Sequence, residues 1–265
     1  MYDIDVKGRN KMSYVNIIAH RGANRYAPQN TLPAFERALQ LGVDGFETDV
    51  HLTKDGVPVI CHNYTINETS NGIGSIASYN YEDLRKLDFG GYYAPQFKGT
   101  KIPALDEFLE LVKQSDISVM NIELKGPKDR KTEFIPEIIT AVKAHNLTDR
   151  LLISGFDTYI LKAVKDCDKK IRTGYLYGMP HCDNYANMMF PIAHAKKIGA
   201  YALHPMSCFV NKAYVKAAHK EGLKVNVWTV NPEDRIRYMI NCGVDGIITD
   251  CPDRAMNIMR SMGVR

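Results

Sequence analysis

Long apolar runs are absent from this sequence of 265 residues. No stretch approaches the roughly 18 consecutive apolar residues of a membrane-spanning helix, and the opening MYDIDVKGRNKMSYVN lacks the apolar segment of a secretory signal. With 45% apolar and 24% charged residues, the composition is that of an ordinary soluble globular protein. The length suits one large domain or two small ones.

Closely spaced cysteines are also missing. The six cysteines, at positions 61, 167, 182, 208, 242 and 251, are far apart and form no CxxC pair. In a chain of this length they indicate free thiols in a reducing compartment, and their spacing argues against a structural zinc site. We therefore expect a cytoplasmic protein.

The sequence has little net charge and no nucleotide-binding loop. Its 34 basic residues exceed the 30 acidic ones by only four and are scattered, so the basic stripe of a nucleic-acid-binding protein is lacking. Neither GxGxxG nor GxxxxGK occurs. We expect a small-molecule substrate and no nucleic-acid partner, and the sequence does not indicate an oligomeric state.

What the sequence does contain is a regular alternation of strand and helix patterns from residue 15 onward. Apolar positions at helical spacing predict helices at 31–41, at about 104–113 and from Asn231 to just before Gly243. Short β-branched runs predict strands at 15–19, 45–51, 57–61, 118–124, 151–154, 172–177, 200–203, 224–229 and 246–249. About eight strand–helix repeats in this length predict an α/β fold, a (β/α)8 TIM barrel.

One segment is echoed later in the chain. GVDGFETD at 42–49 and GVDGIITD at 243–250 share a GVDG-x-x-TD pattern, each at a point where a helix ends on glycine and a strand follows. An ancient duplication and the independent use of a common helix-to-strand turn both account for this echo. In either case the two segments should occupy equivalent entries into the barrel.

Two features depart from a plain barrel. Lys54-Asp55-Gly56-Val57 is a hairpin signal, so 45–51 and 57–62 should pair antiparallel, with one strand extending beyond the barrel wall. Residues 63–103 then lose periodicity, are rich in Asn, Gly, Tyr and Ser, and are too many for a simple loop. We expect one TIM-barrel domain over 1–265 with an inserted subdomain at about 63–103 that caps its mouth.

Two carboxylates share one face of the second predicted strand. Glu47 and Asp49 are two residues apart and point to the same side, so a divalent cation between them would relieve their repulsion. All-oxygen ligation favours Mg²⁺ or Ca²⁺ over zinc, and a solvated strand edge is the simpler alternative. With Asp55 and Gly56 as the two turn residues, Asp49 lies opposite His62, which places that histidine on the carboxylate face.

More charged residues lie at the C-terminal ends of other strands, which face the active site in a TIM barrel. His20 and Arg21 end the first strand, and Glu123 and Lys125 share a face at the end of IELK. Three carboxylates suit a hard cation, two fixed cations suit a phosphate, and two histidines can accept and donate a proton. Together they predict phosphoester cleavage.

These residues resemble the motifs of the glycerophosphodiester phosphodiesterase family, which is built on a TIM barrel like that of PI-PLC. The resemblance covers roughly 15–255 and rests on AHRGANRYAPQNTLPAFERALQLGVDGFETDVHLTKDGVPVICHN, followed by NGIG, IPALDEFLEL, IELK, VWTVN and GVDGIITDCP. It implies hydrolysis of deacylated phospholipids to sn-glycerol 3-phosphate and an alcohol with one divalent cation. The roles it implies are metal ligands at Glu47, Asp49 and Glu123, an acid/base pair at His20 and His62, phosphate contacts at Arg21 and Lys125, and a glycerol contact at Trp228, for which a core aromatic is the alternative.

Three positions differ from the usual family pattern. Gln29 replaces a Glu, Asn63 replaces an Asp, and Glu68 replaces a frequent Arg. None of the three carries a role in metal binding, proton transfer or phosphate binding, so we expect activity to persist. The differences bear on substrate preference and on metal affinity.

Two other functions remain as alternatives. A phospholipase D-like or cyclising activity on lysophospholipids needs an apolar approach for an acyl chain, whereas the 63–103 segment is rich in tyrosine rather than aliphatic. A catalytically silent phosphodiester-binding barrel would be expected to have lost a histidine or a metal ligand, and the sequence retains them all. The headgroup, the choice of Mg²⁺ or Ca²⁺, the direction of proton transfer, and attack by water or by a glycerol hydroxyl stay open.

Overall fold

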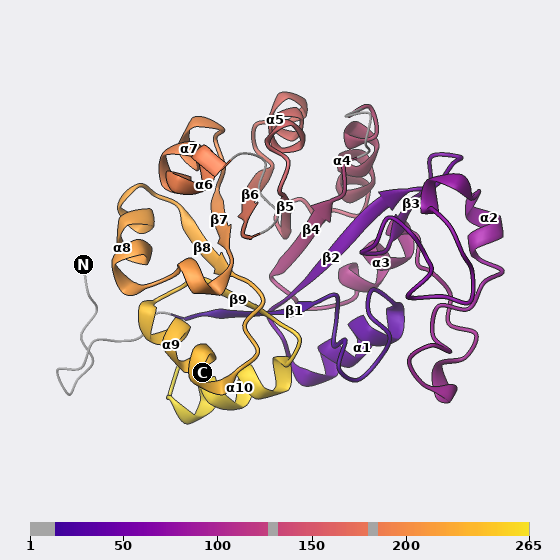
Figure 1. Cartoon of the computed structure of the whole chain (residues 1–265), viewed down its shortest axis with the longest axis horizontal. Coiled ribbons are helices and arrows are strands. Elements are labelled where there is room, and N and C mark those ends of the chain that lie inside the picture. Colours follow the sequence, from indigo (N-terminus) through magenta and orange to yellow (C-terminus); the bar gives the residue numbers. More distant parts are fainter. Residues whose placement is uncertain (1–13, 127–131, 180–184, 265) are drawn as a thin grey trace.

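The computed structural model describes residues 14–126, 132–179 and 185–264, which form a closed barrel of parallel strands (Figure 1). The strand order is β1-β9-β8-β7-β6-β5-β4-β2, and pairing of β1 with β2 closes the ring. The barrel strands are β1 (Asn16–His20), β2 (Gly45–Leu52), β4 (Val119–Leu124), β5 (Leu151–Gly155), β6 (Arg172–Tyr177), β7 (Ala202–Pro205), β8 (Lys224–Val227) and β9 (Gly246–Thr249). The predicted TIM barrel is confirmed.

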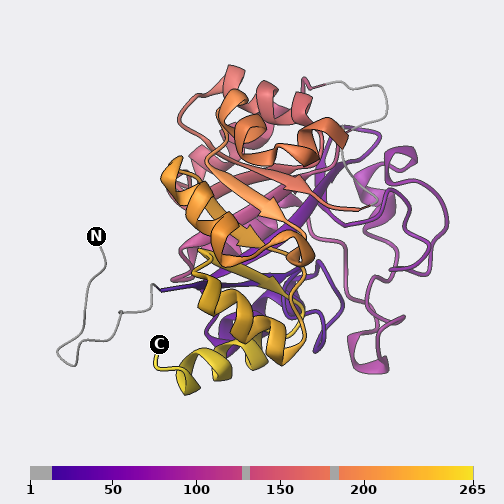
Figure 2. The same ribbon diagram turned by 60° about the vertical axis from the view of Figure 1, so that its left-hand side comes forward.

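Helices surround the barrel on the outside (Figure 2). They are α1 (Leu32–Leu41), α3 (Leu105–Lys113), α4 (Ile135–Ala144), α5 (Thr158–Cys167), α6 (Tyr185–Met189), α7 (Pro191–Lys197), α8 (Lys212–Lys220), α9 (Glu233–Cys242) and α10 (Pro252–Ser261), with a short 3₁₀ turn at Ser207–Phe209. Each long helix buries one apolar stripe; α1, for example, buries Ala34, Phe35 and Ala38 and ends at Gly42 with φ +74°. The three predicted helices correspond to α1, α3 and α9.

The two faces of the barrel strands have different roles. On β2, Phe46 and Val50 pack outward into the layer between strands and helices, while Glu47 and Asp49 face the barrel interior, as the two-residue period requires. The outer layer is apolar and supplies most of the core. The inner face is therefore available for polar side chains at the C-terminal strand ends.

The hairpin after β2 forms, but its register differs from the prediction. β3 (Pro58–Ile60) pairs antiparallel with β2 outside the ring, and Val50 lies opposite Ile60. The amide of Cys61 donates to the carbonyl of Asp49 at 3.0 Å. The prediction that His62 is the residue opposite Asp49 is therefore wrong by one position.

The turn chemistry explains the shift. The Thr53 amide donates to Val57 O at 3.0 Å and the Gly56 amide to Thr53 O at 3.1 Å, so the loop contains three residues instead of two. Gly56 has φ +82° and is the left-handed residue that ends such a loop. His62 lies beyond the last strand pair and reaches the carboxylates from a loop.

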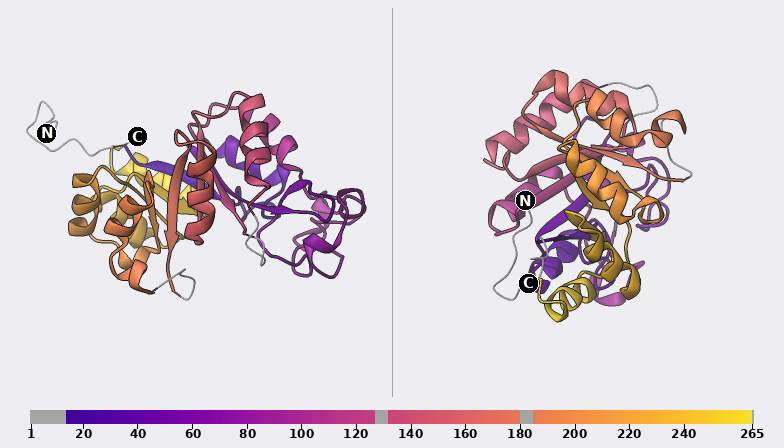
Figure 3. Two further views of the ribbon diagram at one scale, coloured as in Figure 1. Left: turned by 90° about the horizontal axis from the view of Figure 1, so that it is seen from above. Right: turned by 90° about the vertical axis from the view of Figure 1, so that its left-hand side faces the viewer.

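The segment between β3 and α3 lies to one side of the barrel (Figure 3). It contains two 3₁₀ turns, Ile76–Ser78 and Pro95–Phe97, and the short helix α2 (Tyr81–Leu84). A small apolar cluster of its own is formed by Val59, Cys61, Ile66, Ile76, Leu84, Phe89 and Ile102. Its assignment as an inserted subdomain of a single domain stays a prediction.

Two further expectations can be compared with the described residues. Within them, no helix is both long and apolar enough to cross a membrane. Cys61, Cys167, Cys208, Cys242 and Cys251 are free thiols, and Cys182 lies outside the described residues. The cytoplasmic location stays a prediction.

Candidate active site

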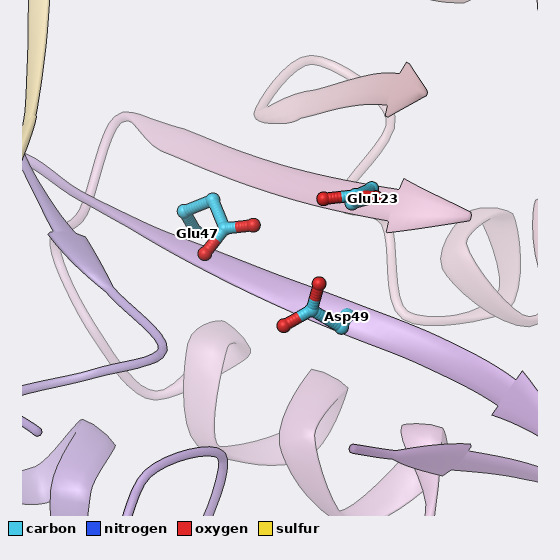
Figure 4. Close-up of side chains that lie close together, drawn as sticks. All are labelled: Glu47, Asp49 and Glu123. Carbon is cyan, nitrogen blue, oxygen red and sulfur yellow. The ribbon is translucent and has the colours of Figure 1, made fainter. Parts of the chain in front are cut away.

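Three carboxylates meet at the C-terminal end of the barrel. Glu47 and Asp49 come from β2 and Glu123 from the adjacent β4, where Asp49 and Glu123 are paired in register. One oxygen from each lies within 4.8 Å of the others, and all three residues are buried. Figure 4 shows the three side chains close together on the two neighbouring strands. The solvated strand edge considered from the sequence is thereby excluded, because an exposed edge would leave these groups in water.

The cluster carries more negative charge than its surroundings neutralise. Burial, together with the charges of Asp49 and Glu123, raises the pKa of Glu47 well above its ordinary value. Burial likewise raises the pKa of Glu123 to about 7, and Asp49 adds to the effect while Lys125 opposes it. Burial also acts to raise the pKa of Asp49, but Lys125 and Arg21 outweigh it and hold that pKa well below its usual range. A hard divalent cation fits a donor set of this kind, because three oxygens converge on one point with unbalanced charge.

Two basic side chains contact the carboxylates. Lys125 Nζ lies 2.9 Å from Asp49 Oδ1 and also pairs with Glu123. Arg21 Nε lies 3.5 Å from Asp49 Oδ2, and its Nη1 donates to Gln29 Oε1 at 2.6 Å. Gln29, one of the departures from the family pattern, therefore holds the guanidinium beside the cluster through a neutral acceptor.

The backbone after β1 is bent so that His20 and Arg21 can both face the site. Arg21 has φ +57° and Gly22 φ +77°. The Arg21 amide donates to Glu47 O at 2.9 Å and approaches Glu47 Oε2 at 3.2 Å. A Cβ on Gly22 would lie 2.7 Å from the Ala34 carbonyl carbon, so this position needs glycine for both conformation and space. The strand ends at the His-Arg pair because the chain turns sharply into the site there.

His20 is held by a carboxylate from the other end of the chain. Its Nδ1 lies 2.6 Å from Asp250 Oδ1, and its Nε2 lies 3.9 Å from Glu47 Oε2. Asn24 donates to the same Asp250 oxygen at 2.6 Å, and Asn231 donates to the other at 2.7 Å. Burial would raise the pKa of Asp250, yet these hydrogen bonds and His20 hold it well below its usual range. Asp250 therefore fixes the orientation of the imidazole.

His62 is held by an amide instead. Its Nδ1 lies 2.6 Å from Asn63 Oδ1, while Asn63 Nδ2 donates to Glu68 Oε2 at 2.7 Å. Because Glu68 accepts from the amide nitrogen, the amide oxygen faces His62, and Nδ1 is the ring nitrogen that carries hydrogen. Burial lowers the pKa of His62 to about 4, against the opposing charge of Asp49. Two of the family departures, Asn63 and Glu68, thus form the support of this histidine.

A cavity of about 120 Å³ adjoins these groups. Six of the eight predicted site residues line it, namely His20, Arg21, Glu47, His62, Glu123 and Trp228. Lys125 lines an adjoining cavity that shares His62 and Glu123. Asp49 lies behind the side chains of Arg21 and Lys125, which both contact it. Trp228 donates from Nε1 to His204 O at 2.7 Å and meets the ring of Phe156 edge-on at 5.6 Å. Trp228 is partly exposed and forms an aromatic wall of this cavity, and its contact with glycerol stays a prediction.

The sequence analysis missed several polar residues around the site. Asp250 was visible only as the echo of Asp49 in the two GVDG-x-x-TD segments, and no role was drawn from that correspondence. Asn30 donates to Asp49 Oδ2 at 2.9 Å, just as Asn231 donates to Asp250. Asn121, two residues before Glu123, also lines the cavity.

Comparison with known proteins identifies the family. The model of the glycerophosphoryl diester phosphodiesterase family matches residues 20–254. The chain belongs to this family. The predicted family and enzyme class are thereby confirmed, and the matched range includes every residue of the candidate site.

Individual relatives match this chain over nearly their full lengths. The chain is 38% identical to a glycerophosphodiester phosphodiesterase of Caldanaerobacter subterraneus subsp. tengcongensis, over 93% of this chain and 98% of that protein. It is 35% identical to a glycerophosphodiester phosphodiesterase of Bacillus altitudinis, again over 93% and 98%. A phosphodiesterase of Oleispira antarctica, solved in complex with the product sn-glycerol-3-phosphate, superposes with a TM-score of 0.83 at 28% identity, over 93% of this chain and 97% of that one.

Proposed function

We propose that this protein hydrolyses glycerophosphodiesters to sn-glycerol 3-phosphate and an alcohol, with one divalent cation, Mg²⁺ or Ca²⁺. The observation that carries the proposal is a cluster of three buried carboxylates, two of which line one small cavity together with two histidines. The names of the relatives support it, as does the product bound to the Oleispira antarctica phosphodiesterase.

Glu47, Asp49 and Glu123 would hold the cation. Their oxygens form a hard donor set, and the raised pKa values of Glu47 and Glu123 are the result expected where positive charge is lacking. When bound, such a cation supplies Lewis-acid activation of a phosphate and charge neutralisation. The choice between Mg²⁺ and Ca²⁺ is left to experiment.

The protein's own residues supply binding and proton transfer. The Arg21 guanidinium, held by Gln29, and the Lys125 ammonium would contact the phosphate. His20 and His62 would act as the acid/base pair, one removing a proton from the nucleophile and the other protonating the leaving alcohol. Each histidine has its Nδ1 engaged by a neighbour, so Nε2 is the nitrogen directed to the reaction.

We also propose that the 63–103 segment caps the mouth of the barrel and forms part of one domain with it. Tyr92 and Tyr93 from this segment border a cavity of about 350 Å³ that includes His20, Arg21 and Gln29. Asn63, Tyr64 and Glu68 border another, of about 620 Å³, beside His62. The segment thus supplies walls next to both histidines, where a leaving alcohol would have to pass.

The deciding experiment measures glycerol 3-phosphate release from glycerophosphocholine and glycerophosphoethanolamine with a coupled dehydrogenase. EDTA-treated protein is compared with samples resupplied with Mg²⁺ or Ca²⁺, and His20→Ala and Glu47→Gln are compared with the surface variant Glu110→Gln. Metal-restorable release that the first two variants lose and the third keeps is the expected result. Choline release, measured in parallel, that is faster from lysophosphatidylcholine than from glycerophosphocholine would favour the lysophospholipid alternative, and no release of either product from a folded protein would favour the silent barrel.

A further inference from the structure

The cavity beside the carboxylates has a polar side and an apolar side. His20, Arg21, Glu47, His62 and Glu123 form the polar side, whereas Phe156, Leu176, Trp228 and Ile248 form the apolar side. The cavity volume of about 120 Å³ is well above the roughly 10–15 Å³ needed to hold a single water. Such a space suits a short carbon chain attached to an anionic group.

Asn121 is a buried amide in the wall of this cavity that the proposed mechanism does not use. It lies on β4 opposite Glu47, and only 1% of it is exposed. Neither its Nδ2 nor its Oδ1 has a hydrogen-bond partner within the described part of the chain. An amide buried without partners destabilises a protein, so such groups normally have hydrogen-bond partners.

Other buried asparagines of the barrel show the contrast. Asn30 donates to Asp49 and accepts from Thr48 at 2.9 Å each. Asn226 Nδ2 lies 3.0 Å from His204 Nε2. Asn121 borders the cavity, and neither its donor nor its acceptor is engaged by the described residues, which is the arrangement of a group that awaits a ligand with hydroxyl chemistry.

We propose that Asn121 binds the terminal hydroxyl of the glycerol moiety and so selects glycerol among possible phosphodiesters. This inference rests on the proposed function and names the residue that recognises that part of the substrate. Asn121 lies two strand residues before Glu123, about 6–7 Å deeper in the barrel. A three-carbon chain that enters from a phosphate held at Arg21 would pass the apolar walls and present its last hydroxyl to the amide.

A matched pair of substrates tests this. Glycerophosphocholine is compared with 2-hydroxypropyl phosphocholine, which lacks only the terminal hydroxyl and keeps the one next to the phosphate ester; choline release is measured for both. Wild-type protein should prefer glycerophosphocholine by about 10- to 100-fold in kcat/KM, as expected where a buried polar group loses its partner. Asn121→Leu should lose this preference and cleave the two substrates at similar rates. Retention of the wild-type preference in Asn121→Leu would overturn the proposal.

Stability and product binding provide independent readouts. Asn121→Leu should keep or raise the melting temperature, because it replaces an unpartnered amide, whereas Asn226→Leu should lower it by removing the partner of His204. sn-Glycerol 3-phosphate should bind the Leu variant at least 10-fold more weakly than it binds the wild type in calorimetry. If Asn121→Leu does not fold, the amide is a structural group and the proposal is wrong unless Asn121→Ala, which leaves more space, folds and shows the loss of preference.

Failure of the two proposals can be told apart. Absence of choline release from wild-type protein with every ion would contradict the proposed function, and product calorimetry would still compare wild type with Asn121→Leu. Normal release together with an unchanged substrate ratio in the variant would contradict only the role of Asn121.

Discussion

Nδ1 of His20 and Oδ1 of Asp250 are 2.6 Å apart although 230 residues separate them in the chain. The pairing of β1 with β9 brings them together, because Ala19 and Thr249 are in register. Closure of the barrel therefore assembles a histidine–carboxylate pair from the two ends of the protein. His20 depends on this closure for its orientation.

Asp250→Asn should lower kcat on glycerophosphocholine by about 10²- to 10⁴-fold with a smaller change in KM. An amide in place of the carboxylate no longer fixes the imidazole in one orientation and tautomer, and losses in that range follow such changes in other histidine–aspartate pairs. Steady-state kinetics and a melting curve provide the measurement. Asp253→Asn is the control, because that carboxylate accepts from the exposed Tyr26 hydroxyl at 2.7 Å, away from His20. Equal kinetics in the two variants would contradict the positioning role.

The echo between the two GVDG-x-x-TD segments reflects a repeated local structure. Asp44 Oδ2 accepts from the Ile17 amide at 2.8 Å, and Asp245 Oδ2 accepts from the Val225 amide at 2.9 Å. Each segment thus anchors the first residues of a neighbouring strand. The prediction of equivalent barrel entries agrees with this, since β2 and β9 are the two parallel neighbours of β1.

The repeat extends to an asparagine ahead of each segment. Thr48 Oγ1 donates to Asn30 Oδ1 at 2.9 Å, and Thr249 Oγ1 donates to Asn231 Oδ1 at 3.1 Å. Each asparagine then donates to the aspartate that follows the threonine. One copy supports a carboxylate of the proposed metal site and the other the carboxylate behind His20. The sequence contained this information only as a spacing of 18 residues from Asn to Thr, which follows no general rule of secondary structure.

Strands, helices and barrel topology were predictable because they depend on local apolar periods and on the alternation of elements. The register of the β2–β3 hairpin was not, because the choice between a two- and a three-residue loop depends on the conformation of Gly56. The partners of His20, His62 and Arg21 were missed for a different reason. Asp250, Asn63 and Gln29 lie in loops, where side-chain directions follow no periodic pattern, and only the closed fold brings Asp250 to His20.

Asn63→Leu should reduce kcat by roughly tenfold, because His62 loses the group that holds its Nδ1. The double variant Asn63→Asp with Glu68→Arg should retain most activity, since an aspartate would accept from the same nitrogen and the arginine would pair with it. Asn63→Asp alone would place two carboxylates side by side, because Asn63 Nδ2 and Glu68 Oε2 are now 2.7 Å apart. Its kcat should lie between those of the other two variants. Rates of glycerophosphocholine cleavage for the three proteins give the order. A double variant as inactive as Asn63→Leu would contradict this account.

Lys125→Met should destabilise the protein in EDTA by about 3–5 kcal/mol, because it leaves Asp49 and Glu123 buried without their shared ammonium. Addition of Mg²⁺ or Ca²⁺ should then recover more stability than in the wild type, since the cation also offsets the lost charge. Urea unfolding with and without metal measures both effects. Lys113→Met, which removes an exposed ammonium 3.8 Å from Glu110, is the control and should change little. A loss of stability that metal does not reduce would argue against a cation at this cluster.

The fully buried His204 should make stability fall at acidic pH. Burial lowers its pKa to about 3, Asn226 is its partner on Nε2, and Gly174 leaves room for the ring. In the unfolded chain its pKa returns to about 6.5, so below that pH the unfolded state gains a proton that the folded state does not bind.

The contribution of His204 is therefore complete above about pH 6.5 and is lost progressively as the pH falls toward 3. Between pH 7.5 and pH 5.0 the loss is about 2 kcal/mol, from 1.36 kcal/mol for each unit below 6.5. Urea unfolding of wild type and His204→Gln at these two pH values isolates the contribution of His204 to the free energy of unfolding. His51 and His62, whose pKa values burial lowers to about 4, titrate in both proteins, so their effects cancel in the comparison. Wild type should lose about 2 kcal/mol more than the variant. Equal losses would mean that His204 takes up its proton without unfolding, which a ring enclosed between β6, β7 and β8 should not do.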